Sequence, residues 1–151
     1  MSKRWIWAAF ALYGAMMLWL MLARHSMDTG EEYWLQVSRN LNLQPLRTIR
    51  HQWRLLNMDR AWAVRSGVVN IYGNVIMFVP LGLFLPWVSE RLRKLWRTLL
   101  ASAAMITAVE ILQLLSLRGS GDVDDLLLNL IGCTLGYFAW KLLASKKKQD
   151  I

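Results

Sequence analysis

The sequence predicts an all-α integral membrane protein, a four-helix bundle with an extracytoplasmic amphipathic helical segment between the first and second spans. The 151 residues are 56% hydrophobic with a mean hydropathy of +0.28, whereas a water-soluble chain must cover its surface with polar groups. Four stretches carry at most one charge each. Each is long enough for a helix that crosses a bilayer core of about 30 Å, which takes roughly 20 residues. We expect a single membrane domain, residues 1–151, with spans at about 5–23, 66–89, 98–117 and 126–145.

The first span has some features of a signal peptide, because Lys3 and Arg4 precede an apolar run. That run exceeds the roughly 7–15 residues of a cleavable apolar region, and Met21 disrupts the small-residue pattern of a cleavage site. We therefore expect the segment to remain as a membrane anchor.

The distribution of basic residues predicts the orientation, because short loops rich in Lys and Arg face the cytoplasm. With four spans, Lys3 and the basic residues of 91–97 and 146–148 fall on one side. Both chain ends are then cytoplasmic, and residues 24–65 and 118–125 face outward. Because membrane topology accounts for the net charge of +8, we expect no nucleic-acid partner.

The outer segment carries a helical pattern. Pro45 can occupy the first position of a helix. Apolar residues then recur at three- and four-residue spacing, at Leu46, Ile49, Trp53 and Leu56. Arginines form a neighbouring stripe of Arg47, Arg50 and Arg54. An amphipathic helix with Trp on one face and Arg on another suits the membrane interface, and a second short helix is expected within residues 31–41.

All the basic residues expected outside, histidines aside, are arginines: Arg24, Arg39, Arg47, Arg50, Arg54, Arg60, Arg65 and Arg118. Because a guanidinium group holds phosphate or carboxylate through two hydrogen bonds, this face suits recognition of an anionic group. Arg47, Arg50 and Arg54 are the expected ligand-binding residues of this face. The alternative is a general bias toward Arg, with local pairing to Asp28, Glu31, Glu32 and Asp59.

Prolines and glycines predict local features of the bundle. Pro80 removes a backbone hydrogen bond and is expected to kink the second span. Gly132 and Gly136 form a G-x-x-x-G pair that allows two helices to approach closely. Gly119, Ser120 and Gly121 mark a tight turn before the fourth span.

Polar residues inside the spans are costly, so their positions carry information. They come from three spans of alternating direction, yet all fall in the outer half of the membrane: Asn70 and Asn74, then Glu110 and Gln113, then Asp122, Asp124, Asp125 and Asn129. We interpret this arrangement as a polar pocket that faces outward.

Structural explanations for the same residues remain open. Asp122 fits an N-cap, with Asp124 and Asp125 at the positive end of the fourth helix. The asparagines fit interhelical hydrogen bonds. Glu110, buried in lipid, must pair with a cation such as Arg118, Arg60 or Arg65, or stay protonated.

Residues for enzyme chemistry are few. His25 and His51 lack metal-ligand spacing, and the chain has no Cys-x-x-Cys pair and no G-x-S-x-G motif. Cys133 fits a packing residue within the fourth span. The carboxylates Glu110, Asp122, Asp124 and Asp125 could together hold Mg²⁺, but capping explains such a group equally simply. We expect no metal and no cofactor, and the only candidate catalytic residue is Glu110.

Three motifs carry a family resemblance: N-V-I-M-F-V-P-L-G from Asn74, E-I-L-Q from Glu110, and D-V-D-D-L-L-L-N-L-I-G-C-T-L-G from Asp122, preceded by Arg118. Their order and spacing over residues 70–137 resemble the VanZ-like family of small bacterial membrane proteins. Upstream, N-L-Q-P-L resembles the family's N-L-x-P-F segment, with Leu46 where Phe is usual.

The resemblance implies a bacterial cell-membrane protein with a role in the cell envelope or in antibiotic tolerance. The family is named for an accessory protein of glycopeptide-resistance clusters, which is associated with low-level resistance to teicoplanin. The resemblance implies no established reaction. By analogy, the ligand-binding positions are Asn74, Glu110, Gln113, Arg118, Asp122, Asp125 and Asn129.

Three functional hypotheses follow. The first is a non-enzymatic protein whose outward pocket engages an amphiphilic ligand: a lipoglycopeptide, a lipid-linked cell-wall precursor or a membrane lipid. The second is a membrane-embedded hydrolase or transferase acting on a lipid-linked substrate, with Glu110 as acid or base. The third is a structural bundle that binds a partner protein.

Overall fold

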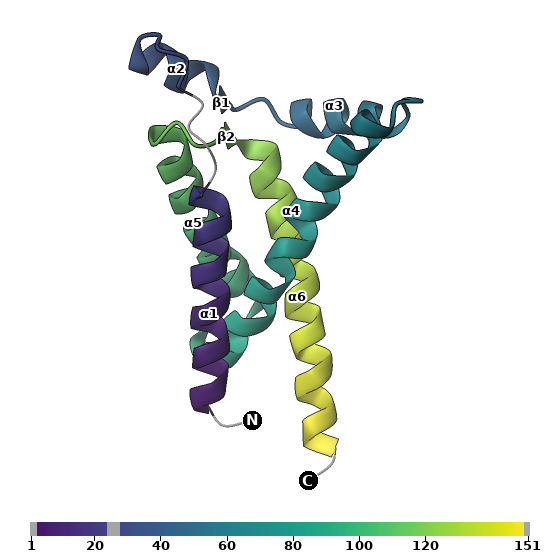
Figure 1. Ribbon diagram of the computed structural model, residues 1–151. Coiled ribbons are helices and arrows are strands. Elements are labelled where there is room, and N and C mark those ends of the chain that lie inside the picture. The colour runs from purple at the N-terminus through teal and green to yellow at the C-terminus, as the bar shows by residue number, and fades with distance from the viewer. Residues whose placement is uncertain (1–2, 24–27, 150–151) are drawn as a thin grey trace.

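Four long helices form the body of the molecule in the computed structural model, which describes residues 3–23 and 28–149 (Figure 1). They are α1 (Lys3–Leu22), α4 (Ala61–Val88), α5 (Leu95–Leu115) and α6 (Val123–Gln149). Each is long and apolar enough to cross a membrane, which confirms the four predicted spans. The start of α1 and the end of α6 lie at the same end of the molecule, as an even number of spans requires.

Large apolar side chains cover the outside of these helices. Ile76 on α4 is 65% exposed, Leu100 on α5 is 64% exposed and Leu142 on α6 is 66% exposed. Exposed apolar area on this scale is unfavourable in water but not against lipid tails. The chain is therefore a multi-pass membrane protein.

Helices α4 and α6 make the tightest contact of the bundle. A Cβ atom added at Gly136 would lie 1.9 Å from the carbonyl oxygen of Val79, and one added at Gly132 would lie 2.1 Å from that of Val75. From the other side, a Cβ at Gly82 would lie 1.9 Å from the carbonyl oxygen of Cys133. The G-x-x-x-G pair therefore has the packing role that its spacing predicts.

The apolar core lies where α1, α4, α5 and α6 meet, and its buried members are Met17, Phe78, Leu81, Leu85, Ile106 and Cys133. Cys133 is a free, buried thiol, in agreement with the expected packing role. Pro80 and Pro86 both lie inside α4, and each removes one helical hydrogen bond. The Tyr13 hydroxyl donates to the carbonyl oxygen of Met77 at 2.8 Å and ties α1 to α4.

Short elements gather at one end of the bundle, which we call the α3 end (Figure 1). They are α2 (Tyr33–Arg39), β1 (Leu41–Asn42), α3 (Arg47–Leu56) and β2 (Gly121–Asp122); a 3₁₀ turn, η1 (Glu90–Leu92), lies between α4 and α5. Both helices expected in the segment between the first two spans are present.

Helix α3 begins two residues later than Pro45, so the predicted start was wrong. Leu46 adopts a left-handed backbone with φ 64° and serves as the N-cap, and the helix begins at Arg47. The apolar stripe was expected at the membrane interface, and its member Trp53 is 58% exposed, whereas Leu55, which lies outside the stripe, is buried. A Cβ at Gly67 would lie 2.7 Å from the carbonyl oxygen of Gln52, which shows how closely α3 approaches α4.

A two-residue parallel ladder joins β1 to β2, pairing Leu41 with Gly121 and Asn42 with Asp122. This ladder was not predicted from the sequence. The turn that leads into β2 begins at Leu117, where φ is 53°. The N–H groups of Leu117 and Arg118 donate to the carbonyl oxygens of Leu114 and Gln113, which is the Schellman pattern of helix termination. The predicted turn at Gly119–Gly121 therefore starts earlier than expected.

Candidate functional site

The carboxylate of Asp124, in the first turn of α6, caps the N-terminus of α3. Its Oδ1 accepts the N–H of Leu46 at 2.5 Å, and its Oδ2 accepts those of Thr48 at 2.7 Å and Ile49 at 3.1 Å. Asp124 is completely buried. Because a carboxylate satisfies helix N-terminal donors and favours the positive end of the helix dipole, this one side chain fixes α3 on α6.

Asp122 links three segments. Its Oδ1 accepts the backbone N–H of Asp124 at 2.9 Å, so it caps its own helix, as the capping interpretation expects. It also accepts the Thr48 hydroxyl at 2.5 Å and the Asn42 amide at 3.1 Å. The two aspartates are therefore structural acceptors that hold β1 and α3 in place.

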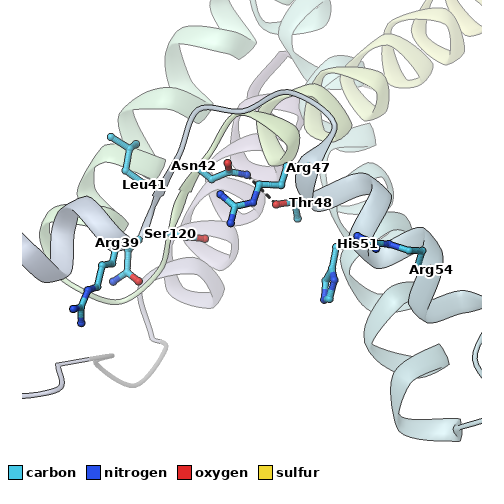
Figure 2. A pocket seen from close by; sticks show the side chains of 9 residues that line it. Arg39, Leu41, Asn42, Arg47, Thr48, His51, Arg54 and Ser120 are labelled. Carbon is cyan, nitrogen blue, oxygen red and sulfur yellow. Dashed lines mark hydrogen bonds between the residues drawn. The ribbon is translucent and has the colours of Figure 1, made fainter.

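A basic pocket of about 530 Å³ opens beside these contacts at the α3 end (Figure 2). We define it by its lining residues: Arg39, Asn40, Leu41, Asn42, Arg47, Thr48, His51, Arg54 and Ser120. None of them is acidic. Figure 2 shows Arg47 between Arg39 of α2 on one side and His51 and Arg54 of α3 on the other.

The guanidinium groups of the basic pocket are weakly constrained. Arg39 forms an exposed salt bridge with Glu31, and exposed pairs contribute only about 0–1 kcal/mol. Arg54 donates through Nε to the carbonyl oxygen of Arg50 at 3.3 Å, which leaves its terminal nitrogens for other partners. An anion can therefore recruit these side chains at small cost.

The predicted arginine stripe divides between two surfaces. Arg47 and Arg54 line the basic pocket, whereas Arg50 does not. Arg50 and Arg54 instead line a neighbouring hollow of about 510 Å³ together with Ile49 and Trp53. Arg39, which is not part of the predicted stripe, also lines the basic pocket.

Asn74 and Asp125, two of the polar residues predicted to line the outward pocket, connect α4 to α6. The Asn74 amide donates to Oδ1 of Asp125 at 2.8 Å. Asn70, by contrast, donates to the Ser66 carbonyl oxygen of its own helix at 3.2 Å. The interhelical hydrogen bond expected of the asparagines is thus present at Asn74 and not at Asn70.

Gln113 and Arg118 hold the end of α1. The Gln113 amide donates to the carbonyl oxygen of Met21 at 2.8 Å, and Arg118 donates to that of Leu22 at 2.7 Å. Because helix C-terminal carbonyl groups lack partners within the helix, these two side chains satisfy acceptors that α1 leaves open.

Glu110, on α5, is only 9% exposed. Its Oε1 has no hydrogen-bond partner, and among residues 3–23 and 28–149 it forms no salt bridge. Of the two alternatives for Glu110, pairing with Arg118, Arg60 or Arg65 is therefore not found in the described part of the chain, where Arg118 instead binds α1. Oδ1 of the buried Asn129 likewise has no partner.

Glu110 lines a second pocket of about 210 Å³ between α5, β1 and the start of α6, which we call the Glu110 pocket. Its other lining residues are Leu41, Leu43, Thr107, Ile111, Leu114, Gly121, Asp122, Val123 and Leu126. The described residues contain no group of three or more His, Cys, Asp or Glu placed to hold a metal ion, so the suggested Mg²⁺ site is not formed.

The roles of Asn42, Thr48 and Arg39 were not predicted from the sequence. The N-L-Q-P-L segment contains Asn42 and was the only available signal that this stretch has a fixed structure. Arg24 and His25, which belong to the outer segment, lie outside the described residues.

The fold and the site define a four-span membrane protein whose short outer elements are bound to the first turn of its last helix. The chain matches the VanZ/LLP1 family over residues 10–144. It therefore belongs to this family. No curated protein and no solved structure matches it.

Proposed function

We propose that this protein is a bacterial cell-membrane protein that binds the anionic group of an amphiphilic envelope ligand in its basic pocket. One observation carries this inference: three arginines and a histidine line one hollow of about 530 Å³ that contains no acidic side chain. The fork of donors on each guanidinium matches a phosphate or carboxylate.

The orientation that brings this pocket to the outer leaflet is supported by charge. The basic residues of 91–97 and 146–148 belong to the end opposite α3, and such loops face the cytoplasm. Both chain ends are then cytoplasmic. Trp34 and Trp53, exposed on α2 and α3, suit the depth of the lipid head groups.

Family membership supports an envelope role and narrows the candidate ligands. The family's association with teicoplanin makes a lipoglycopeptide one candidate, because such a molecule combines an acyl chain with ionised groups. A lipid-linked cell-wall precursor and an anionic phospholipid have the same combination. All three would present an anion at the membrane surface, where the basic pocket opens.

The cellular test is teicoplanin susceptibility of a bacterium with and without expression of the full chain. We expect expression to raise the minimum inhibitory concentration. We also expect the triple variant Arg39→Lys, Arg47→Lys, Arg54→Lys to lose this effect at equal protein abundance, because Lys keeps the charge but not the paired hydrogen bonds. Arg50→Lys is the matched control and should retain it. Full protection by the triple variant would contradict a role for the basic pocket.

A further inference from the structure

The Glu110 pocket contains a buried acceptor that the fold leaves without a partner. Buried polar atoms are nearly always hydrogen-bonded, and each exception requires an explanation. Oε1 of Glu110 is such an exception within a side chain that is 9% exposed. The rest of the lining is mostly apolar, and its other polar side chains are Thr107 and Asp122.

Two acidic side chains and no basic one line this pocket. They are Glu110 and Asp122. Asp122 accepts hydrogen bonds from neutral donors: the Asn42 amide, the Thr48 hydroxyl and the Asp124 backbone. Neutral donors satisfy the oxygens but do not compensate the charge. Within the described chain, neither Glu110 nor Asp122 forms a salt bridge.

We propose that the Glu110 pocket is a second subsite, which takes the protonated primary amine of a membrane amphiphile. An ammonium group supplies the N–H donor that Oε1 lacks and the positive charge that the neighbouring carboxylates favour. The volume of about 210 Å³ is below the roughly 300–1,000 Å³ of sites that enclose a whole small molecule, so it fits one group of a larger ligand. This subsite goes beyond the anion recognition proposed above and does not depend on it.

The position of the pocket suits a ligand that comes from the bilayer. Thr107 and Ile111 are exposed on the lipid-facing surface of α5, and they form one rim. Glu110 lies five residues before the end of α5, which is about 8 Å along the helix axis. Leu41 of β1 and Asp122 of β2 line the pocket as well. A head-group amine can therefore approach Glu110 from the interface.

The test compares two phospholipids that differ only in the substituents of their nitrogen. Dilauroyl phosphatidylethanolamine and dilauroyl phosphatidylcholine both carry one phosphate and one positive nitrogen, but only the first has ammonium N–H donors. Each is titrated into the detergent-purified full chain, and bound lipid is counted by native mass spectrometry. We expect the ethanolamine lipid to bind about tenfold more tightly or better, since a charge-assisted hydrogen bond is worth about 1.5–3 kcal/mol.

Variants assign the preference to the pocket. Glu110→Gln should abolish it, whereas Glu90→Gln, an exposed glutamate in η1, should leave it unchanged. Thr107→Trp places a large side chain at the rim and should abolish the preference while the carboxyl group remains, which covers the case in which Glu110→Gln does not fold. Equal binding of the two lipids by the unmodified chain would overturn the amine subsite. So would a preference that survives either Glu110→Gln or Thr107→Trp in folded protein.

Discussion

At the scale of single residues, the carboxylate of Asp124 controls the geometry of the basic pocket without lining it. A left-handed backbone costs an L-residue such as Leu46 about 1–2 kcal/mol. Asp124 compensates by accepting the N–H groups of Leu46, Thr48 and Ile49. Because α3 carries Arg47, His51 and Arg54, loss of this acceptor would displace most of the pocket's basic side chains.

We predict that Asp124→Ala lowers the free energy of unfolding by about 3 kcal/mol or more, because three buried N–H groups lose their acceptor. Asp124→Asn keeps one oxygen and should cost less. Unfolding of the purified protein in mixed detergent and dodecyl sulfate micelles measures both changes. Asp59→Ala alters an exposed carboxylate and serves as the control. An Asp124→Ala variant as stable as the Asp59→Ala variant would contradict the capping role.

The sequence could identify Asp124 as significant but not assign its partner. Its place at the start of an apolar helix predicts a favourable interaction with that helix's own dipole. The observed partner is a helix 75 to 78 residues away in the chain. No local pattern encodes a contact at that separation. The same holds for Glu110, where spacing predicts burial but not the absence of a paired arginine.

At the scale of elements, the sequence predicts the spanning helices well, because each needs only a long apolar run. The short elements are harder to predict from the sequence. A two-residue strand such as β1 has no periodicity, and the start of α3 depends on a left-handed Leu46 that propensity does not favour. The close pairing of α4 with α6 lies between these cases, since the glycine spacing predicted close contact but not the partner helix.

We predict that Gly82→Ala destabilises the pairing of α4 and α6 by about 1–3 kcal/mol, the usual range for overpacking. The new Cβ would lie 1.9 Å from the carbonyl oxygen of Cys133, so the two helices must separate. Gly73→Ala on the same helix is the matched control, because no atom lies within 4 Å of its added Cβ. It should be neutral or stabilising by about 0.5–1 kcal/mol through helix propensity. The same micelle unfolding assay compares them, and equal effects would contradict close packing at Gly82.

At the scale of the whole molecule, orientation decides whether the basic pocket meets the outer leaflet. Ser38 on α2 and Ser145 on α6 are both exposed and lie at opposite ends of the bundle. We predict that a cysteine at Ser38 reacts with an impermeant thiol reagent in intact cells, whereas one at Ser145 reacts only after permeabilisation. The native Cys133 is buried and should not contribute. Labelling of the Ser145 site in intact cells would reverse the orientation.

Binding of an anionic lipid by the purified chain tests the basic pocket most directly. Dilauroyl phosphatidic acid, a phosphate-bearing probe, is titrated into the detergent-purified protein, and its dissociation constant is measured by native mass spectrometry. The Arg39→Lys, Arg47→Lys, Arg54→Lys variant is compared with Arg50→Lys, Arg60→Lys, Arg65→Lys, which changes the same number of arginines outside the pocket. We expect the first variant to bind at least about tenfold more weakly than the unmodified chain, because it loses paired, charge-assisted hydrogen bonds, and the second to bind nearly as well. Equal affinity of the two variants would contradict the assignment of anion recognition to the basic pocket.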